Sequence, residues 1–295
     1  MSVIAVVNRK GGSGKSTLAT HFAAVFANIG ATVALGDIDR QQSTRAWLRH
    51  RKSSGERTRI LGWNVDAKTF VRAPVGIDHV VMDTPGGLTG LDLARVVMYA
   101  DAVVMPVSHS LFDRTSAADC LAELRTMPRV QSGRCRVAAV GMRIDPQADA
   151  AERLRAWAAE QRIALVAVLP QSHVYVRCVE RGLTLFDVPQ AQVEEELTHW
   201  QPLLQWMRPM LQPPANAGAV AEGPLRAAGA LPRSSSAPVM DQPKPDTLAR
   251  GPRPAPEPRA PGASSTEAPR VEEGSSGTDR LRDVIPLPRF LQRKP

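Results

Sequence analysis

A glycine-rich loop near the N-terminus constrains the fold of this chain more than any other segment. It lies between a short β-branched run at residues 3–8 and an amphipathic helical pattern at residues 15–28, and it reads Lys10-Gly11-Gly12-Ser13-Gly14-Lys15-Ser16-Thr17. Glycines at three positions let successive backbone N–H groups point into one concavity, and the N-terminus of the following helix adds its positive dipole end there. This order of strand, loop and helix predicts a polyphosphate site.

The polar side chains of the loop indicate how a polyphosphate would be held. Lys15 is expected to neutralise the β and γ phosphates, and the Ser16 hydroxyl to take one coordination position on Mg²⁺. The usual spacing has a glycine where this chain has Arg9, and a second lysine follows at Lys10. A glycine loop that merely joins a strand to a helix is the alternative, but two lysines and a Ser-Thr pair have no packing purpose there.

Acidic residues follow two further strand patterns. Asp83 ends an apolar run, and we interpret it as a Walker B aspartate that holds Mg²⁺. Asp37 and Asp39 end the second strand pattern, and period-two spacing puts both carboxylates on one side of an extended segment. One of them is expected to orient the attacking water, while a helix N-cap role for Asp39 is the alternative. In an open parallel sheet, such strand ends flank one ligand-binding crevice.

Short β-branched runs alternate with helical patterns along the first 211 residues. This alternation predicts an α/β fold with a doubly wound, mainly parallel sheet that is covered on both faces. Strands are expected at residues 3–8, 32–36, 79–83, 102–107, 137–144 and 163–169, with an extra edge strand at 60–65. Helices are expected at residues 15–28, 41–52, 88–99, 114–126, 149–161 and 191–211.

The composition changes sharply near residue 211. Of the 25 prolines in the 295 residues, 16 fall in the last 85. We therefore expect a folded domain at residues 1–211, a disordered Pro/Ala/Ser-rich linker at 212–278 and a short partner-docking peptide at 279–295. The linker has too little apolar surface to offset its ordering entropy. For the last segment, a chance hydrophobic cluster at a frayed terminus is the alternative.

The motifs taken together resemble those of the deviant Walker A ATPases, the ParA/MinD superfamily of bacterial positioning and partition ATPases. The residues that carry the resemblance are the loop at 10–17, Asp37-Ile38-Asp39 and Asp83-Thr84-Pro85-Gly86. The resemblance covers residues 1 to about 210. It implies a P-loop NTPase fold, ATP and Mg²⁺ as cofactors, and a homodimer that closes around two ATP molecules.

The resemblance also implies a role for each site residue. It makes Lys10, Lys15 and Asp39 catalytic, with Lys10 reaching the phosphates held by the other subunit and Asp39 positioning the water. The residues implied to bind the nucleotide are Gly11, Gly12, Ser13, Gly14, Lys15, Ser16 and Thr17, and those implied to hold the metal are Ser16 and Asp83. A lysine supplied by the partner subunit would make hydrolysis depend on dimerisation.

A positioning ATPase of this kind acts on a cargo, such as a plasmid, a chromosome region or a protein cluster, and DNA is the expected track. The formal net charge of +8 permits contact with nucleic acid or anionic lipid. Basic residues cluster after the second strand pattern, at Arg45, Arg49, Arg51, Lys52, Arg57 and Arg59. ParA-like proteins are similar in presenting DNA-contacting arginines where this chain has Arg177 and Arg181. A solvated helix face is the alternative interpretation.

The remaining features concern location and partners. Pro286 and Pro288 would break a C-terminal amphipathic helix, which argues against membrane insertion. No segment resembles a signal peptide or a spanning helix, and the three cysteines lack CxxC spacing. We therefore expect a cytoplasmic, nucleoid-associated protein whose tail binds a stimulating or cargo protein. The alternatives are an accessory ATPase of a secretion or polysaccharide machine, and a metabolic ATPase on the same scaffold.

Overall fold

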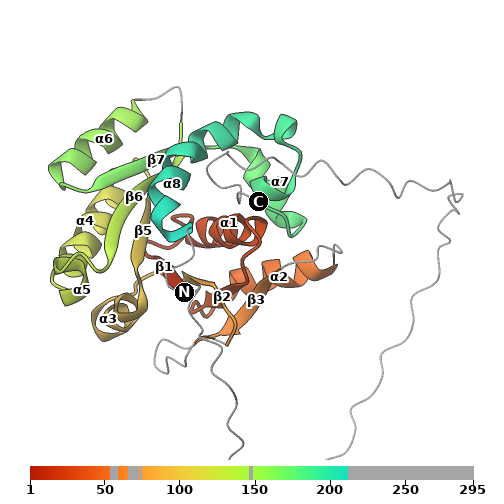
Figure 1. Ribbon diagram of the computed structural model, residues 1–295. Coiled ribbons are helices and arrows are strands. Elements are labelled where there is room, and N and C mark those ends of the chain that lie inside the picture. The colour runs from red at the N-terminus through yellow and green to blue at the C-terminus, as the bar shows by residue number, and fades with distance from the viewer. Residues whose placement is uncertain (54–58, 66–72, 74, 146–148, 212–295) are drawn as a thin grey trace, which may run out of the picture. The chain divides into compact units, whose positions relative to one another are not determined.

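A seven-stranded sheet organises the chain (Figure 1). The computed structural model describes residues 1–53, 59–65, 73, 75–145 and 149–211. All the paired strands are parallel, in the order β3-β2-β4-β1-β5-β6-β7. The predicted doubly wound parallel sheet is therefore confirmed. The linker predicted at 212–278 and the docking peptide predicted at 279–295 lie outside the described residues.

The strands agree closely with the sequence pattern. Their bounds are β1 Ser2–Val6, β2 Val33–Asp37, β3 Ile60–Asn64, β4 His79–Asp83, β5 Ala102–Val107, β6 Arg136–Ile144 and β7 Ala164–Pro170. The edge strand predicted at 60–65 is present as β3, where Ile60 is buried but Leu61 is exposed. An outermost strand has a neighbour on one side only, so its apolar pattern is weaker than that of the central strands.

The helices include two that the sequence pattern did not reveal. The bounds are α1 Lys15–Asn28, α2 Ser43–Ser53, α3 Gly90–Tyr99, α4 Leu111–Arg125, α5 Pro128–Gln131, α6 Ala150–Glu160, α7 His173–Glu180 and α8 Glu194–Leu211. Helices α5 and α7 span only four and eight residues. Three valines in α7 also favour extended structure, and its apolar pattern spans only two turns, too short to stand out as a helix in the sequence.

Two apolar cores lie on opposite faces of the sheet. One contains residues of α1, α7 and α8, with Phe22, Phe26 and Trp200 among its largest side chains. The other contains residues of α3, α4 and α6, including Leu124 and Trp157. Burial on both faces explains why the central strands are continuous apolar runs. Among the described helices, none is long and apolar enough to cross a membrane.

The strand register brings the functional motifs to one edge of the sheet. Val6 at the end of β1 is level with Asp83 at the end of β4, and Asp83 is level with Asp37 at the end of β2. The glycine loop leaves the sheet directly after β1. In-register parallel pairing of the three central strands thus places the glycine loop and both acidic motifs at the same carboxyl-end crevice.

Candidate nucleotide-binding site

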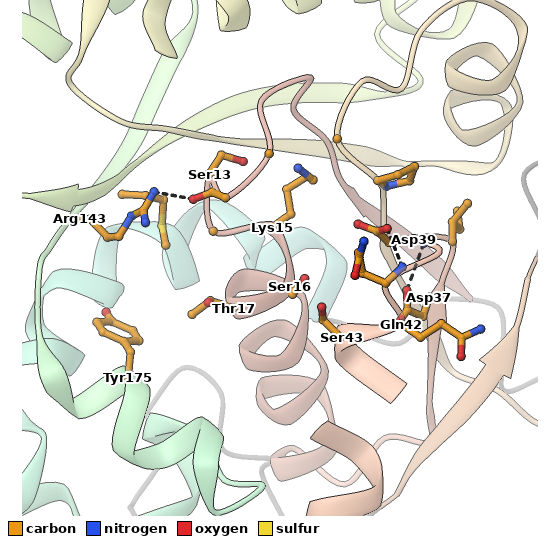
Figure 2. Close-up of a pocket in the computed structure, with 18 of the residues that line it drawn as sticks. Ser13, Lys15, Ser16, Thr17, Asp37, Asp39, Gln42, Ser43, Arg143 and Tyr175 are labelled. Carbon is orange, nitrogen blue, oxygen red and sulfur yellow. Dashed lines mark hydrogen bonds between the residues drawn. The ribbon is translucent and has the colours of Figure 1, made fainter. Parts of the chain in front are cut away.

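A hollow of about 1340 Å³ lies at this edge of the sheet. Its walls come from the glycine loop at 11–17, the segment at 37–43 after β2, Met142 and Arg143 on β6, and the segment at 169–176 that leads into α7. Figure 2 shows Lys15 above the start of α1, with Asp37 and Asp39 to one side and Arg143 and Tyr175 to the other. The predicted nucleotide residues at 11–17 all line the hollow.

Contacts with neighbouring strands fix the shape of the glycine loop. The Asn8 side-chain amide donates to the Pro106 carbonyl at 2.6 Å, and its oxygen accepts from the Lys10 N–H at 3.0 Å. Gly14 has φ +101°, and a Cβ there would lie 2.7 Å from the Met142 Cε. Only glycine fits this left-handed position against β6 without displacing Met142. The loop is therefore shaped by the fold even without a ligand.

Lys15 is buried at the floor of this loop. Its Nζ donates to the Lys10 carbonyl at 2.9 Å. Burial lowers the pKa of Lys15, while the negative charges of Asp83 and Asp39 act in the opposite direction. The hydrogen-bond partner of this buried ammonium is a neutral carbonyl, so a phosphate in the loop could add a charged hydrogen bond to Lys15.

Asp83 lies beneath the hollow and is fully buried. Neither carboxylate oxygen has a hydrogen-bond partner among the described residues. Burial raises the pKa of Asp83 to about 7; the nearby Ser16 hydroxyl and Lys15 lower it, and Asp37 and Asp39 raise it. A buried carboxylate without a partner is costly unless a cation compensates it.

The residues around Asp83 fit a magnesium ion. Mg²⁺ is usually bound through one or two protein oxygens together with phosphate oxygens and water. Asp83 and Ser16 supply two such oxygens under the phosphate-binding loop, and no group of three or more His, Cys, Asp or Glu side chains that would suit another metal is present in the described residues. This donor set matches a metal that arrives with a nucleotide.

Asp37, the last residue of β2, and Asp39 have different surroundings, although the sequence pattern treats them alike. The Asp37 carboxylate is buried and accepts from the Thr44 hydroxyl at 2.8 Å and from the Arg45 N–H at 3.2 Å, so it caps the start of α2. Asp39 is half-buried, lines the hollow and accepts from the Gln41 N–H at 3.0 Å. The capping role considered for Asp39 thus belongs to Asp37, and Asp39 is left facing the ligand space.

Lys10 lies at the rim of the loop, outside the residues that line the hollow. Its Nζ is 3.9 Å from the Asp113 carboxylate and 5.8 Å from the centre of the Phe112 ring. Phe112 and Leu111, at the start of α4, are 75% and 65% exposed. An exposed lysine beside exposed apolar side chains is typical of a surface that contacts another protein.

Residues 4–186 match the sequence profile of the CobQ/CobB/MinD/ParA nucleotide binding domain. The chain belongs to this family. A curated relative, "Maintenance of carboxysome distribution protein A" from Gloeobacter kilaueensis, is 36% identical over 117 residues, or 38% of this chain and 51% of that protein. The matched part thus spans about half the length of that relative.

Solved structures agree with the family fold. An ATP complex of McdA from Cyanothece has a TM-score of 0.54 at 14% identity and covers 69% of this chain and 96% of that one. The cell division ATPase MinD from Pyrococcus furiosus has a TM-score of 0.54 at 16% identity. The match covers 71% of this chain and 99% of that one. The chain has the MinD-like P-loop NTPase fold.

One part of the site of this CobQ/CobB/MinD/ParA-family domain has no role that the sequence alone assigns. Met142 and Arg143 on β6, together with Pro170 and Tyr175 near α7, line the end of the hollow opposite Asp39. Arg143 has φ +53° and donates to the Gly12 carbonyl, which ties β6 to the glycine loop (Figure 2). In the sequence, the only sign that Arg143 belongs to the site is its position directly after an apolar run.

The arginines predicted to contact DNA lie away from this hollow. Arg177 is exposed on α7, and Arg181 is exposed directly after it. Neither lines the hollow. Gly182, the residue after Arg181, packs against α2: a Cβ added at Gly182 would lie 2.3 Å from the backbone N of Arg51. The two arginines therefore lie near α2.

Proposed function

We propose that this chain is an ATPase that dimerises when it binds ATP and uses this switch to position or partition a cargo on DNA. The observation that carries the proposal is the convergence of Lys15, Asp39 and the unpartnered Asp83 carboxylate on one phosphate-binding loop. The curated relative from Gloeobacter is named for the distribution of carboxysomes, which supports a positioning role. In this proposal a stimulating or cargo protein acts on the ATP-bound dimer.

Each residue of the loop has a distinct task in hydrolysis. The backbone N–H groups of residues 11–14 and the Lys15 ammonium hold the β and γ phosphates, while Thr17 contacts the α phosphate. Ser16 and Asp83 would hold Mg²⁺, which neutralises charge that develops on the phosphates. Asp39 orients a water in line with the bond that breaks. Phosphoryl transfer needs positioning and charge neutralisation, and these residues supply both.

Lys10 has a separate task, because its side chain lies at the surface rather than inside its own hollow. In the dimer, Lys10 of one subunit reaches the phosphates held by the other. The exposed apolar residues Leu111 and Phe112 beside it would be covered by the partner subunit. Hydrolysis then removes the phosphate that Lys10 contacts, and the subunits separate.

The end of the hollow opposite Asp39 is assigned to the adenosine. Met142, Pro170 and Tyr175 offer apolar and aromatic surface, while Arg143 braces the Gly12 carbonyl. The Tyr175 hydroxyl accepts from the Trp200 indole N–H at 2.9 Å, which fixes the ring at the wall. A flat, rigid and partly apolar wall suits a purine base.

DNA binding is assigned to the adjoining surfaces of α2 and α7. Arg49, Lys52, Arg177 and Arg181 are exposed there. Arg51, which the sequence pattern grouped with them, is 3% exposed and forms a bidentate ion pair with Asp187 at 2.8 and 2.7 Å, so it is removed from the set. Arg59 donates to the Gly30 carbonyl, and Arg57 lies outside the described residues.

ATP hydrolysis and DNA retention, measured at several salt concentrations, test this proposal. We expect DNA to stimulate hydrolysis and to be retained by the ATP-bound protein, with both effects fading as salt rises. The double variant Arg177→Ala/Arg181→Ala should reduce the salt slope by about 1 for each lost phosphate contact. Arg153→Ala/Arg155→Ala is the matched control, because these arginines are exposed on α6, which Figure 1 shows far from α7.

The outcome distinguishes the proposal from its alternatives. Loss of DNA retention in the α7 variant but not in the α6 variant supports positioning on DNA. ATP hydrolysis that is indifferent to DNA at every salt concentration contradicts it, and would instead favour an accessory ATPase of a secretion or polysaccharide machine or a metabolic ATPase.

A further inference from the structure

The outer edge of β7 has no strand beside it among the described residues. A second hollow of about 710 Å³ adjoins β7 and is lined by residues of α6 and α8. Alanines on α6 leave the space open on one side, and α8 bounds the other side. The lining residues from the two helices are Ala151, Arg155, Ala158, Ala159, Thr198, His199 and Pro202.

The side chains of β7 are covered incompletely on both faces. Leu165 and Val168 are half-buried against the core that contains α6, and Val166 is half-buried against the core that contains α8. Unpaired backbone groups next to apolar side chains form a template that natural proteins normally block or cover. An added strand with apolar residues on both faces would extend both cores.

We propose that residues 284–290 of the same chain pair with this edge as an eighth strand. Their sequence, Val284-Ile285-Pro286-Leu287-Pro288-Arg289-Phe290, is nearly continuously apolar, as strands covered on both faces are. Ile285 and Leu287 each precede a proline, which biases both of them toward extended backbone. The segment therefore has the composition and the backbone preference that the edge of β7 requires.

The spacing of the two prolines is what makes this pairing feasible. In an extended strand, alternate residues direct their N–H groups to the same side, so the donors missing at Pro286 and Pro288 fall on one side. The N–H groups of Ile285, Leu287 and Arg289 all point to the other side and are available to β7. Prolines on the outer side would also stop a further strand from adding.

The length of the chain permits this return. Seventy-two residues, 212–283, separate the end of α8 from Val284. Even a Gly/Ser-rich chain of 72 residues has a root-mean-square span of about 45 Å, enough to cross a domain of this size, and prolines lengthen the span. α8 borders the hollow with Thr198, His199 and Pro202, but its C-terminal end lies beside β1, where the Met210 carbonyl accepts from the Ser2 hydroxyl at 3.3 Å. The linker therefore has to pass β5 and β6 to reach β7, and its length allows this. Tethering raises the effective concentration of the segment, which favours even weak pairing.

Hydrogen exchange on the full-length protein without nucleotide tests this inference independently of ATP chemistry. In the wild type, we expect the outward amides of residues 164–170 to be protected. Leu287→Pro removes a donor that faces β7, and should speed their exchange by roughly tenfold or more. Pro286→Leu is the matched control, because it swaps the same two residue types at a position on the outer side. The rate of hydrogen exchange at residues 164–170 should then stay as in the wild type.

Two other results would overturn the inference. Exchange at 164–170 that is the same in the wild type and in Leu287→Pro would show that this segment does not cover β7. Protection that grows with protein concentration and survives Leu287→Pro would assign the edge to a second copy of the chain. Both variants lie outside the described domain, so neither is expected to prevent its folding.

Discussion

The Lys15 ammonium donates a hydrogen bond of 2.9 Å to the backbone carbonyl of Lys10, which links the two lysines of the glycine loop. The side chains then diverge: Lys15 is 6% exposed at the floor of the hollow, whereas the side chain of Lys10 is 42% exposed at its rim. This divergence fits the proposed function, in which Lys15 acts within its own subunit and Lys10 acts on the other subunit.

Lys15→Ala is expected to weaken nucleotide binding strongly. The change removes the buried cation that faces the phosphates, and a charged hydrogen bond of this kind corresponds to a loss of about 10- to 100-fold in affinity. Titration calorimetry with ATP and Mg²⁺ measures the effect. Lys10→Ala, which removes an equal charge from the same loop, is the control and should bind ATP nearly as well as the wild type.

Lys10→Ala should instead slow hydrolysis. If Lys10 stabilises charge on phosphates held by the partner subunit, its removal should lower the rate by about 10²- to 10³-fold. In the wild type, the rate per subunit should rise with protein concentration until dimers saturate. A Lys10→Ala protein that hydrolyses ATP at the wild-type rate would show that this lysine has no role in trans.

Asp83 should make the free energy of unfolding of the nucleotide-free protein depend on pH. The pKa of Asp83 is about 7 in the folded chain, against a value of 3.8 for an ordinary aspartate. The folded state therefore binds the Asp83 proton more tightly than the unfolded state does. The stability that this proton contributes is present below about pH 4 and is lost as pH rises through 7. Asp83→Asn, which resembles the neutral acid, should raise the free energy of unfolding by about 2–4 kcal/mol at pH 8 and change it little at pH 4.

The same substitution should remove magnesium-dependent hydrolysis, so a stabilised protein would also be inactive. Urea unfolding at pH 4 and pH 8, without nucleotide, supplies the stability comparison. An Asp83→Asn protein that is less stable than the wild type at pH 8 would mean that the native carboxylate is compensated by a group other than a bound metal.

Gly182 is predicted to be indispensable for packing α2 against the segment after α7. It has φ +69°, and a Cβ there would lie 2.3 Å from the Arg51 backbone N. Gly182→Ala should therefore cost about 3 kcal/mol or more of unfolding free energy, through strain and displacement of α2. Gly133→Ala is the matched control, because Gly133 has φ +70° but no atom within 4 Å of the added Cβ. It should cost only about 1 kcal/mol.

The sequence predicts the sheet and the place of the glycine loop well because both depend on local patterns. Apolar runs that are buried on both faces mark β1, β2 and β4, and glycine spacing marks the loop between β1 and α1. The predicted edge strand at β3 is also confirmed. These features require no knowledge of which distant residues meet.

Features that depend on long-range contacts were not accessible in the same way. Asp37 and Asp39 look equivalent in sequence, but the packing of α2 gives only Asp37 a capping partner in Thr44. Arg51 looks like a surface cation until Asp187, 136 residues away, pairs with it. Arg143 reaches Gly12 across 131 residues of chain. Short sequence patterns contain no information about such pairs.

The central claim is that ATP joins two of these chains, and the association state of the purified protein tests it most directly. Sedimentation velocity should show a single chain without nucleotide, and the mass of two chains with Mg²⁺ and a non-hydrolysable ATP analogue. Lys10→Ala should remain a single chain under both conditions. A wild-type protein that binds the analogue and keeps the mass of one chain at every concentration would contradict the account.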